Sequence, residues 1–565
     1  MKTLAVFLLA LFFYFSPSLS APFSSRGQAR EALVVAAMFQ QDNLILPLRN
    51  GTDVPSKPPL FHWSAYGASL IAGGLSEATT RTPSLLAAAA TVALTYYCVA
   101  GLFGIRTGIL AAIILGSTLE WIRGANVARV DMVFAFCLSC GFFLLLEIAR
   151  RAAKVQPPAG WLYFLLGLAL GGGILTKGPT GLLIPLVAAA FYLLSQYRLN
   201  FRQAFTDFPL KLVVMACLVS LLVSAWWYLA AYLQGGNRFL EVALLRENFA
   251  RVVDVEGLDP GHQKPFYFSL IDFAVGFLPW SVLAIPLLYV VFRSRDFGGM
   301  PEVRSAILLS LCWAVSFVVA VALASSKRTV YLIPAYPALA LVLSYYLANA
   351  TRIPQLKFTF CRLVLGFVWA MLVVIVALLA CLLLGGAELF SKLPFIDPRY
   401  LDDVIYISSV LKSSIPFFVG LVLALIFLVI ALLSARKAAL DISCGALGLG
   451  IGFVALALNY GAFPQIAEFN SPREFSQKLK EIVPTRAPIY YYRNDFFSVV
   501  YYSGRNIPEL KDLAALGIDP ETYLLIAKRD LPLTDGLGER RRVVLESDNN
   551  AFYGKDKLIL LRISQ

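Results

Sequence analysis

Two carboxylates stand beside arginines at the edges of apolar segments, where their side chains could do chemistry. Asp131 lies in the run ARVDMVF, two residues after Arg129, and Glu31 directly follows Arg30. A carboxylate close to an arginine stays ionised, and an ionised carboxylate can act as a general base. Asp131 could equally cap a helix or interact with its dipole, so the residues alone leave both interpretations open.

Basic side chains recur at similar boundaries along the chain. Lys57 is followed by two prolines, which fix the backbone behind its ammonium group. Cations that gather at the mouth of apolar helices suit a phosphate or pyrophosphate that carries an apolar tail. For each residue singly, snorkelling to a membrane interface is the alternative. The candidate binding residues are Arg30, Lys57, Arg129, Lys177, Arg251, His262, Lys327 and Arg328.

The elements that must position these residues are helices in a bilayer. Of 565 residues, 59% are hydrophobic and only 15% are charged, with a mean hydropathy of +0.72. A soluble fold of this length could not bury so much apolar surface. The net charge of +13 comes mostly from Lys and Arg in short links between apolar runs. This pattern is typical of membrane topology, and no nucleic-acid partner is expected.

Apolar stretches of the length that spans a bilayer occur about thirteen times, since a spanning helix needs about 20 residues. The Lys and Arg clusters of the links fall on one side if the N-terminus is cytoplasmic. The candidate residues and the C-terminus then lie outside. Residues 1–20 are interpreted as an uncleaved first span, with a cleaved signal peptide as the alternative.

The chain divides into two predicted domains. Residues 1–460 form the transmembrane domain, with long outer links at 21–80, which contains interfacial helices, and at 235–266. Beyond residue 461 hydropathy drops, and short β-like runs alternate with polar helical pieces. Residues 461–565 therefore predict a small α/β domain on the outer face. The spacing of Cys137 and Cys140 inside an apolar run indicates helix packing rather than redox chemistry or metal binding.

The order of these motifs resembles the GT-C glycosyltransferases related to the protein O-mannosyltransferases, and within them the bacterial lipid A aminoarabinose transferases. The resemblance covers about residues 10 to 340 and, more loosely, the tail. It is carried by the order and spacing of several short motifs. They are GQAREALVVAAMFQQDNLILPLRNGTDVPSKPP, ARVDM, LTKGP, ENFARV, HQKPFYF, FLPW and SSKRTVYLIPAYPALAL.

The chain departs from this family at two places. The acidic pair of the family's first loop falls on Gly27 and Gln28, so Glu31 is the nearest carboxylate that could take the acidic role. An acidic residue that can hold a metal in the aminoarabinose transferases, together with a histidine matching His262, is Ser56 here. A lone histidine is a poor metal site, and neither a metal nor another cofactor is expected.

The resemblance implies a sugar donor linked to a polyprenyl phosphate, and a lipid or protein acceptor at the periplasmic face of a bacterial inner membrane. Asp131 and Glu31 are then the candidate catalytic carboxylates, while the basic residues compensate the charge of the departing phosphate. A lipid-sugar flippase or secondary transporter is the alternative, although such proteins usually carry inverted repeats and ionisable groups at the bilayer midplane. A non-catalytic envelope scaffold would leave the clustered cations unexplained.

Overall fold

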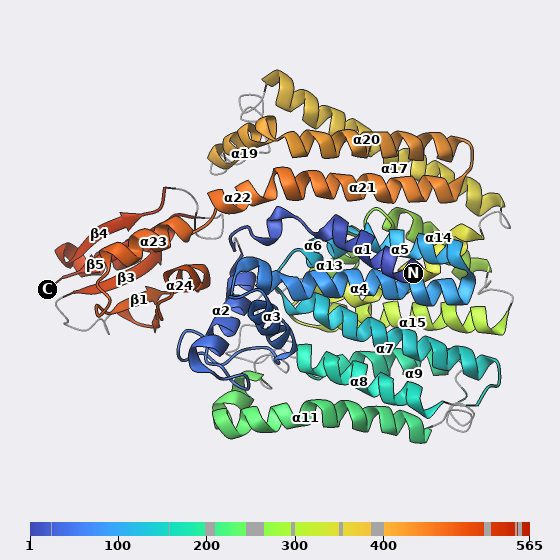
Figure 1. Ribbon diagram of the computed structural model, residues 1–565, viewed down its shortest axis with the longest axis horizontal. Coiled ribbons are helices and arrows are strands. Elements are labelled where there is room, and N and C mark those ends of the chain that lie inside the picture. The colour runs from blue at the N-terminus through green and yellow to red at the C-terminus, as the bar shows by residue number, and fades with distance from the viewer. Residues whose placement is uncertain are drawn as a thin grey trace.

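A body of long helices carries a small sheet domain at one end in this computed structural model (Figure 1). The structure describes residues 1–23, 25–157, 159–197, 200, 210–243, 265–294, 300–349, 354–385, 401–513, 521–548, 551 and 556–564. The N-terminus lies in the half of the helical body farther from the sheet domain, short of its far end. Helices α2 (Arg26–Gln41) and α3 (Leu60–Ile71) lie between the body and the sheet domain.

The helical body is built from apolar helices that run in alternating directions. They are α1 (Lys2–Tyr14), α4 (Glu77–Phe103), α5 (Ile105–Gly116), α6 (Leu119–Ala125), α7 (Val130–Ala153), α8 (Gly160–Lys177), α9 (Thr180–Gln196), α11 (Leu210–Leu240), α13 (Phe268–Gly276), α14 (Ser281–Ser294), α15 (Pro301–Leu323), α16 (Tyr336–Ala348), α17 (Pro354–Ala380), α19 (Leu401–Ser413), α20 (Ile415–Arg436) and α21 (Leu440–Gly461). Short turns of other helix types occur as η1 (Pro17–Leu19), η3 (Thr329–Ala335) and η5 (Cys381–Gly385).

The predicted class of polytopic helical membrane protein is confirmed. Within the described residues, 9 helices are long and apolar enough to cross a membrane, or up to 11 if each of two bent pairs is one span. The helices α1 and α9 are apolar but shorter than this length criterion. The expected number of about thirteen spans is therefore not confirmed and stays a prediction.

Two broken helices meet inside the body. Helices α5 and α6 are bent by 68°, and α13 and the first part of α14 by 117°. At the breaks the amide of Leu119 donates to the carbonyl of Leu278 at 2.9 Å, and the indole of Trp280 donates to Ser117 Oγ at 3.1 Å. Because lipid offers no hydrogen-bond partners, these bonds satisfy polar groups at one break with partners at the other.

Glycines let neighbouring helices approach closely. A Cβ atom added to Gly167 of α8 would lie 2.6 Å from Val219 of α11, and one added to Gly171 would lie 2.8 Å from Val223. Small residues at these contacts allow the helix backbones to pack, which is how helices associate without a hydrophobic driving force. Cys137 of α7 lies in such a contact, because a Cβ on Gly172 would come within 3.0 Å of its sulfur.

The chain after α21 continues through α22 (Phe463–Phe469) and α23 (Arg473–Ile482) into a five-stranded sheet. The strands are β1 (Ile489–Tyr492), β2 (Glu509–Leu510), β3 (Thr522–Ala527), β4 (Arg541–Glu546) and β5 (Leu558–Ile563), in the order β2-β1-β3-β5-β4. Strand β1 is parallel to β2 and β3, and β5 is antiparallel to β3 and β4. The strand β3 is buried on both sides, which agrees with its continuous apolar run TYLLIA.

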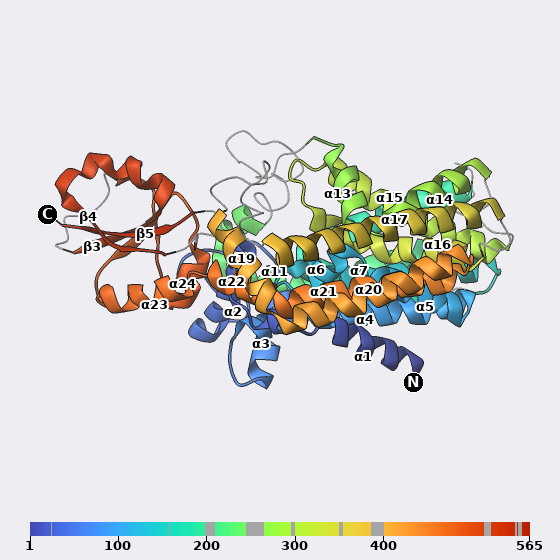
Figure 2. The ribbon, with the colours of Figure 1, turned by 90° about the horizontal axis from the view of Figure 1, so that it is seen from above.

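Each face of the sheet is covered by different helical segments. The segment η8 (Lys528–Arg540) covers one face, where Leu531 and Leu537 pack against Leu524 and Ile526. Figure 2 shows α23 and α24 (Phe497–Ser503) on the opposite side of the sheet. The apolar side chains of that side join the core of the helical body, so the sheet domain packs against the helices.

One local prediction in this domain was wrong. The run SVVYYS at 498–503 has the alternation and the β-branched residues of a strand, but it forms the helix α24. Its apolar side chains are needed on one face, because Phe497 and Val500 are buried in the core that joins the domain to the helical body. Burial therefore overrides the local preference for a strand.

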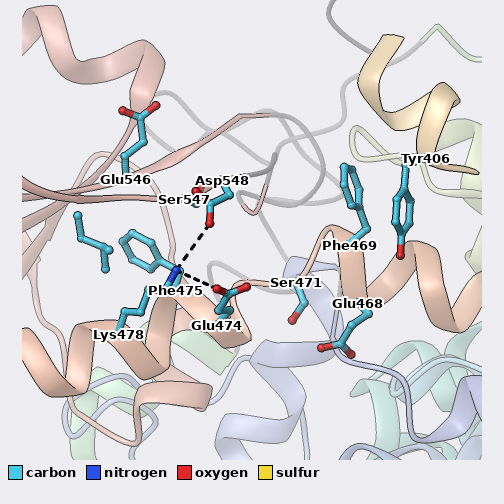
Figure 3. A pocket seen from close by; sticks show the side chains of 11 residues that line it. Tyr406, Glu468, Phe469, Ser471, Glu474, Phe475, Lys478, Glu546, Ser547 and Asp548 are labelled. Carbon is cyan, nitrogen blue, oxygen red and sulfur yellow. Dashed lines mark ion pairs between the residues drawn. The ribbon is translucent and has the colours of Figure 1, made fainter.

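A cleft separates α19 and α22 from the sheet domain, as Figure 3 shows. Tyr406 and Phe469 stack at one side of it, with ring centroids 4.1 Å apart. On the other side Lys478 pairs with Glu474 at 2.8 Å and with Asp548 at 3.6 Å. The division into domains at residue 461 stays a proposal, although α21 ends at Gly461.

Candidate functional site

Asp131 lies at the centre of a cluster of charged side chains at the end of the body next to α2 and α3. Lys177, the last residue of α8, approaches Asp131 Oδ1 with its Nζ at 2.5 Å. Arg129 precedes α7 and its Nε lies 3.3 Å from Asp131 Oδ2. The Asp131 side chain is only 5% exposed. Because a buried charge must be paired, this geometry keeps Asp131 as a carboxylate between two cations.

Aromatic rings enclose the ammonium group of Lys177. Its Nζ lies 4.5 Å from the ring centroid of Tyr331 and 5.0 Å from that of Phe134. Tyr331 belongs to η3, the segment that directly follows Lys327 and Arg328. Cation–π contacts of this kind stabilise a desolvated ammonium group and fix its direction. Tyr331 was not identified from the sequence, where it reads as one more apolar residue of a span.

Lys57 belongs to the same region. A small cavity is lined by residues 55–58, by Lys177 and Gly178, and by Trp227, Tyr228 and Ala243. The structure thus brings Lys57, Arg129, Lys177 and Asp131 together from four distant parts of the sequence.

Glu31 forms a second cluster, on α2. Its Oε1 accepts from Arg30 Nη2 at 2.5 Å, and its Oε2 lies 2.8 Å from His62 Nε2. The side chains of Glu31 and His62 are 3% and 1% exposed. Burial opposes ionisation of Glu31, but Arg30 and His62 outweigh it and hold the pKa of this carboxyl well below its usual range. Glu31 is therefore ionised and enclosed by its partners.

His62 is a residue of this cluster that the sequence analysis missed. Its Nδ1 is buried and has no hydrogen-bond partner among the described residues. Arg49 lies in the same region, where burial and then the charge of Arg30 lower its pKa. A histidine inside an apolar helix gives no sequence signal of a carboxylate partner that is supplied by another helix.

Lys327 and Arg328 follow α15, and they differ in burial. Lys327 is buried, and its Nζ donates to the carbonyl of Ala324 at 2.5 Å, at the end of α15. This direction is favourable because the negative end of the helix dipole lies there. Arg328 is half-buried at the start of η3. The predicted residues Arg251 and His262 lie outside the described residues.

No group of three or more His, Cys, Asp or Glu side chains that could hold a metal ion occurs among the described residues. His262, which the sequence analysis considered as a metal ligand, lies outside the described residues. The expected absence of a metal therefore stays a prediction.

Gly27 and Gln28 occupy the positions of the family's first-loop acidic pair. Both lie next to the Asp131 cluster. A Cβ atom on Gly27 would lie 3.6 Å from the guanidinium carbon of Arg129. Gln28 Oε1 accepts a hydrogen bond from the amide of Ala128, directly before Arg129, at 3.2 Å. The first outer segment therefore contacts the turn that carries Arg129 and Asp131.

Comparison with known proteins agrees with this arrangement. Residues 56–228 match the family model described as dolichyl-phosphate-mannose-protein mannosyltransferase. An uncharacterized protein of Aquifex aeolicus is 28% identical over 362 residues, which are 64% of this chain and 65% of that protein. The undecaprenyl phosphate-alpha-4-amino-4-deoxy-L-arabinose arabinosyl transferase of Erwinia tasmaniensis is 28% identical over 324 residues, 56% of this chain and 54% of that enzyme. The chain thus aligns with less than two thirds of the length of these relatives.

Solved structures show the fold over nearly the whole chain. ArnT from Cupriavidus metallidurans bound to undecaprenyl phosphate is similar with a TM-score of 0.74, over 99% of this chain and 97% of that chain, at 17% identity. The archaeal oligosaccharyltransferase AglB from Archaeoglobus fulgidus is similar with a TM-score of 0.50, over 95% of this chain and 70% of that chain, at 12% identity.

The fold is thus that of the GT-C membrane proteins, with many spans and a polar site at one end of the helices. The sequence matches agree with this likeness, since they also fall on a protein O-mannosyltransferase family model and on an aminoarabinose transferase.

Proposed function

We propose that this protein transfers a sugar from a polyprenyl-phosphate donor to a lipid or protein acceptor. The observation that carries the proposal is the buried carboxylate of Asp131 between Lys177 and Arg129, at the end of a bundle of apolar helices. An anionic head group can bind to the cations there while its apolar tail lies along the helices. A relative of the same fold holds undecaprenyl phosphate, which supports this choice of donor.

The proposed reaction is an in-line displacement at the anomeric carbon of the sugar. An oxygen of the acceptor forms the new bond to this carbon, while the bond between the carbon and the phosphate oxygen breaks. The electron pair leaves with the lipid phosphate, and the configuration of the carbon is inverted. Lys57 and Lys177 line one cavity and compensate the charge of the phosphate, with Arg251, Lys327 and Arg328 as the further proposed cations.

Asp131 is the proposed catalytic carboxylate. If the acceptor is a hydroxyl group, its proton passes to Asp131, whereas a phosphate acceptor is already ionised and needs no strong base. Glu31 stays the second proposed carboxylate. Since it is enclosed by Arg30 and His62, it would act by fixing Arg30 rather than by direct contact in this conformation.

The proposal includes an orientation in the membrane. The charged cluster and the sheet domain lie at the same end of the helical body. We assign that end to the periplasmic face of a bacterial inner membrane, because the Lys and Arg clusters of the links then fall in the cytoplasm. The transferred sugar is taken to be a hexose or a pentose.

Two experiments test the proposal. Mass spectrometry of lipid and protein fractions from cells with and without the chain identifies a glycosylated product. Purified protein in vesicles is then assayed with the matching labelled donor, for the wild type and for Lys57→Ala and Asp131→Asn. Both variants should lower transfer by about a hundredfold or more.

Two control variants carry the same substitutions elsewhere. Asp441→Asn lies at the opposite end of the helices, and Lys478→Ala lies in the sheet domain, so both should transfer like the wild type. Transfer by Lys57→Ala and Asp131→Asn at the rate of these controls would refute the site. Movement of label across the vesicle membrane without a glycosylated product would favour a transporter instead.

A further inference from the structure

Gln28 connects α2 to the turn that carries the charged cluster. Its side-chain oxygen accepts from Arg81 Nε at 2.8 Å and from the amide of Ala128 at 3.2 Å. Its side-chain nitrogen donates to Ser25 Oγ at 3.2 Å. The side chain is buried, and Ala128 directly precedes Arg129. The side-chain amide of Gln28 therefore joins Arg81 to the backbone of this turn.

Arg81 holds the segment before α2. It is a buried residue of α4, and its Nη1 donates to the carbonyls of Ser18, Leu19 and Ala21 at 3.0, 2.6 and 2.5 Å. Its guanidinium group also lies 5.0 Å from the ring centroid of Phe23. Because a guanidinium group presents its donors in a fixed fork, these contacts determine the direction of the Nε that reaches Gln28.

The sheet domain reaches the same helix one turn earlier. Glu77, at the start of α4, accepts from the hydroxyl of Tyr502 at 2.9 Å and from Arg473 Nη2 at 2.5 Å. The Tyr502 hydroxyl also accepts from the amide of Phe23 at 2.8 Å. Tyr502 thus binds both α4 and the segment that Arg81 holds.

A second contact joins the sheet domain to the first outer segment. The side chain of Asn50 donates to the carbonyl of Ile507 at 2.7 Å and accepts from its amide at 2.8 Å. All four groups are buried, and such paired hydrogen bonds fix both distance and direction. Figure 1 shows the resulting arrangement, with α24 directed toward α2.

We infer that the sheet domain, acting through Tyr502, Glu77, Arg81 and Gln28, sets the position of the turn at 128–131 and hence of Arg129 and Asp131. These four are positioning residues, and Gln28 makes the last contact. The inference deepens the proposed function and rests on it wherever transfer is the readout. The sheet domain thus helps to position Arg129 and Asp131, although it contacts neither of them in the hydrogen bonds described above.

Gln28 is tested by two substitutions, of which one removes the shared acceptor oxygen and the other keeps it. Gln28→Ala removes the oxygen that Arg81 and Ala128 share, whereas Gln28→Glu keeps an acceptor at that place. We expect Gln28→Ala to lower kcat by about tenfold or more with little change in KM for the donor, because misplaced catalytic groups slow the chemical step. Gln28→Glu should restore most of the rate. Ser25→Ala, which removes only the third hydrogen bond of Gln28, is the matched control.

The contribution of the sheet domain is tested by Tyr502→Phe, with Tyr501→Phe as the control at the neighbouring tyrosine. Amide hydrogen exchange of the peptide that covers residues 126–132 is measured for every variant. We expect faster exchange of this peptide in Gln28→Ala and Tyr502→Phe than in the controls. The first variant loses the acceptor of the Ala128 amide, and the second loses the hydroxyl that bonds Glu77 and Phe23.

The outcomes separate the inference from the proposed function. Equal exchange and equal kcat in Gln28→Ala and Ser25→Ala would overturn the role of Gln28. Equal values in Tyr502→Phe and Tyr501→Phe would overturn the role of the domain. If the wild type transfers no sugar, the proposed function fails, but the exchange measurement still decides whether the domain positions the turn.

Discussion

The pair of Lys177 and Asp131 allows a sharp test of how the site is held together. The side chains are largely buried, at 11% and 5% exposure, and Nζ lies 2.5 Å from Oδ1. Removing one partner of a buried pair costs about 3–5 kcal/mol, because the other charge stays buried without compensation. Arg129 remains 3.3 Å from Asp131, so we expect the lower limit, about 3 kcal/mol, for Lys177→Met.

The double variant separates pairing from other effects. Asp131→Asn alone leaves the ammonium group of Lys177 buried, but in combination with Lys177→Met neither charge remains. We therefore expect the two losses to be non-additive, with a coupling free energy of about 2 kcal/mol in favour of the pair. The free energy of unfolding is measured by denaturant titration in detergent micelles for the wild type, both single variants and the double variant.

The exposed pair of Arg106 and Asp441 provides the control cycle, because its side chains are 63% and 26% exposed. The cycle of Arg106→Met and Asp441→Asn should give a coupling of about 0–1 kcal/mol, as solvent-exposed pairs do. Losses in the Lys177 and Asp131 cycle that add within about 0.5 kcal/mol would refute the reasoning. Sugar transfer should be lost in all three variants, including the double variant that regains stability.

Two further predictions concern the pH dependence of stability and the packing of two helices. Since the pKa of Glu31 lies below its ordinary value of 4.5 in the folded protein, its stabilising effect is complete above that pH and is lost as the pH falls further. Glu31→Gln should therefore be less stable than the wild type at pH 7, with a difference in thermal midpoint that shrinks below about pH 4.5; a constant difference would contradict this. Gly181→Ala would place a Cβ against the backbone of Gly173, so it should destabilise the fold by about 1–3 kcal/mol, whereas Gly101→Ala, which faces open space, should not. Equal unfolding free energies for these two glycine variants would show that α8 and α9 can separate without cost.

The sequence by itself determined the class of protein and most of the parts of the site. A bilayer selects helices by the hydropathy of each segment, which is a local property, so the apolar runs indicate their own structure. Ionisable side chains at membrane level are costly to desolvate and therefore indicate a functional site, and on this ground Asp131, Lys57 and Lys177 were identified. The strands β1, β3, β4 and β5 were likewise visible as short apolar runs.

Only the tertiary structure decided which of these side chains meet. Lys177 and Asp131 form a pair because α7 begins where α8 ends, and Glu31 binds His62 because α2 lies against α3. The helix α24 and the contacts of Gln28 also depend on surfaces that come from distant parts of the chain. A buried hydrogen bond or ion pair depends on how whole helices and the sheet domain pack. The sequence of one segment does not show which residue of a distant segment its side chains will contact.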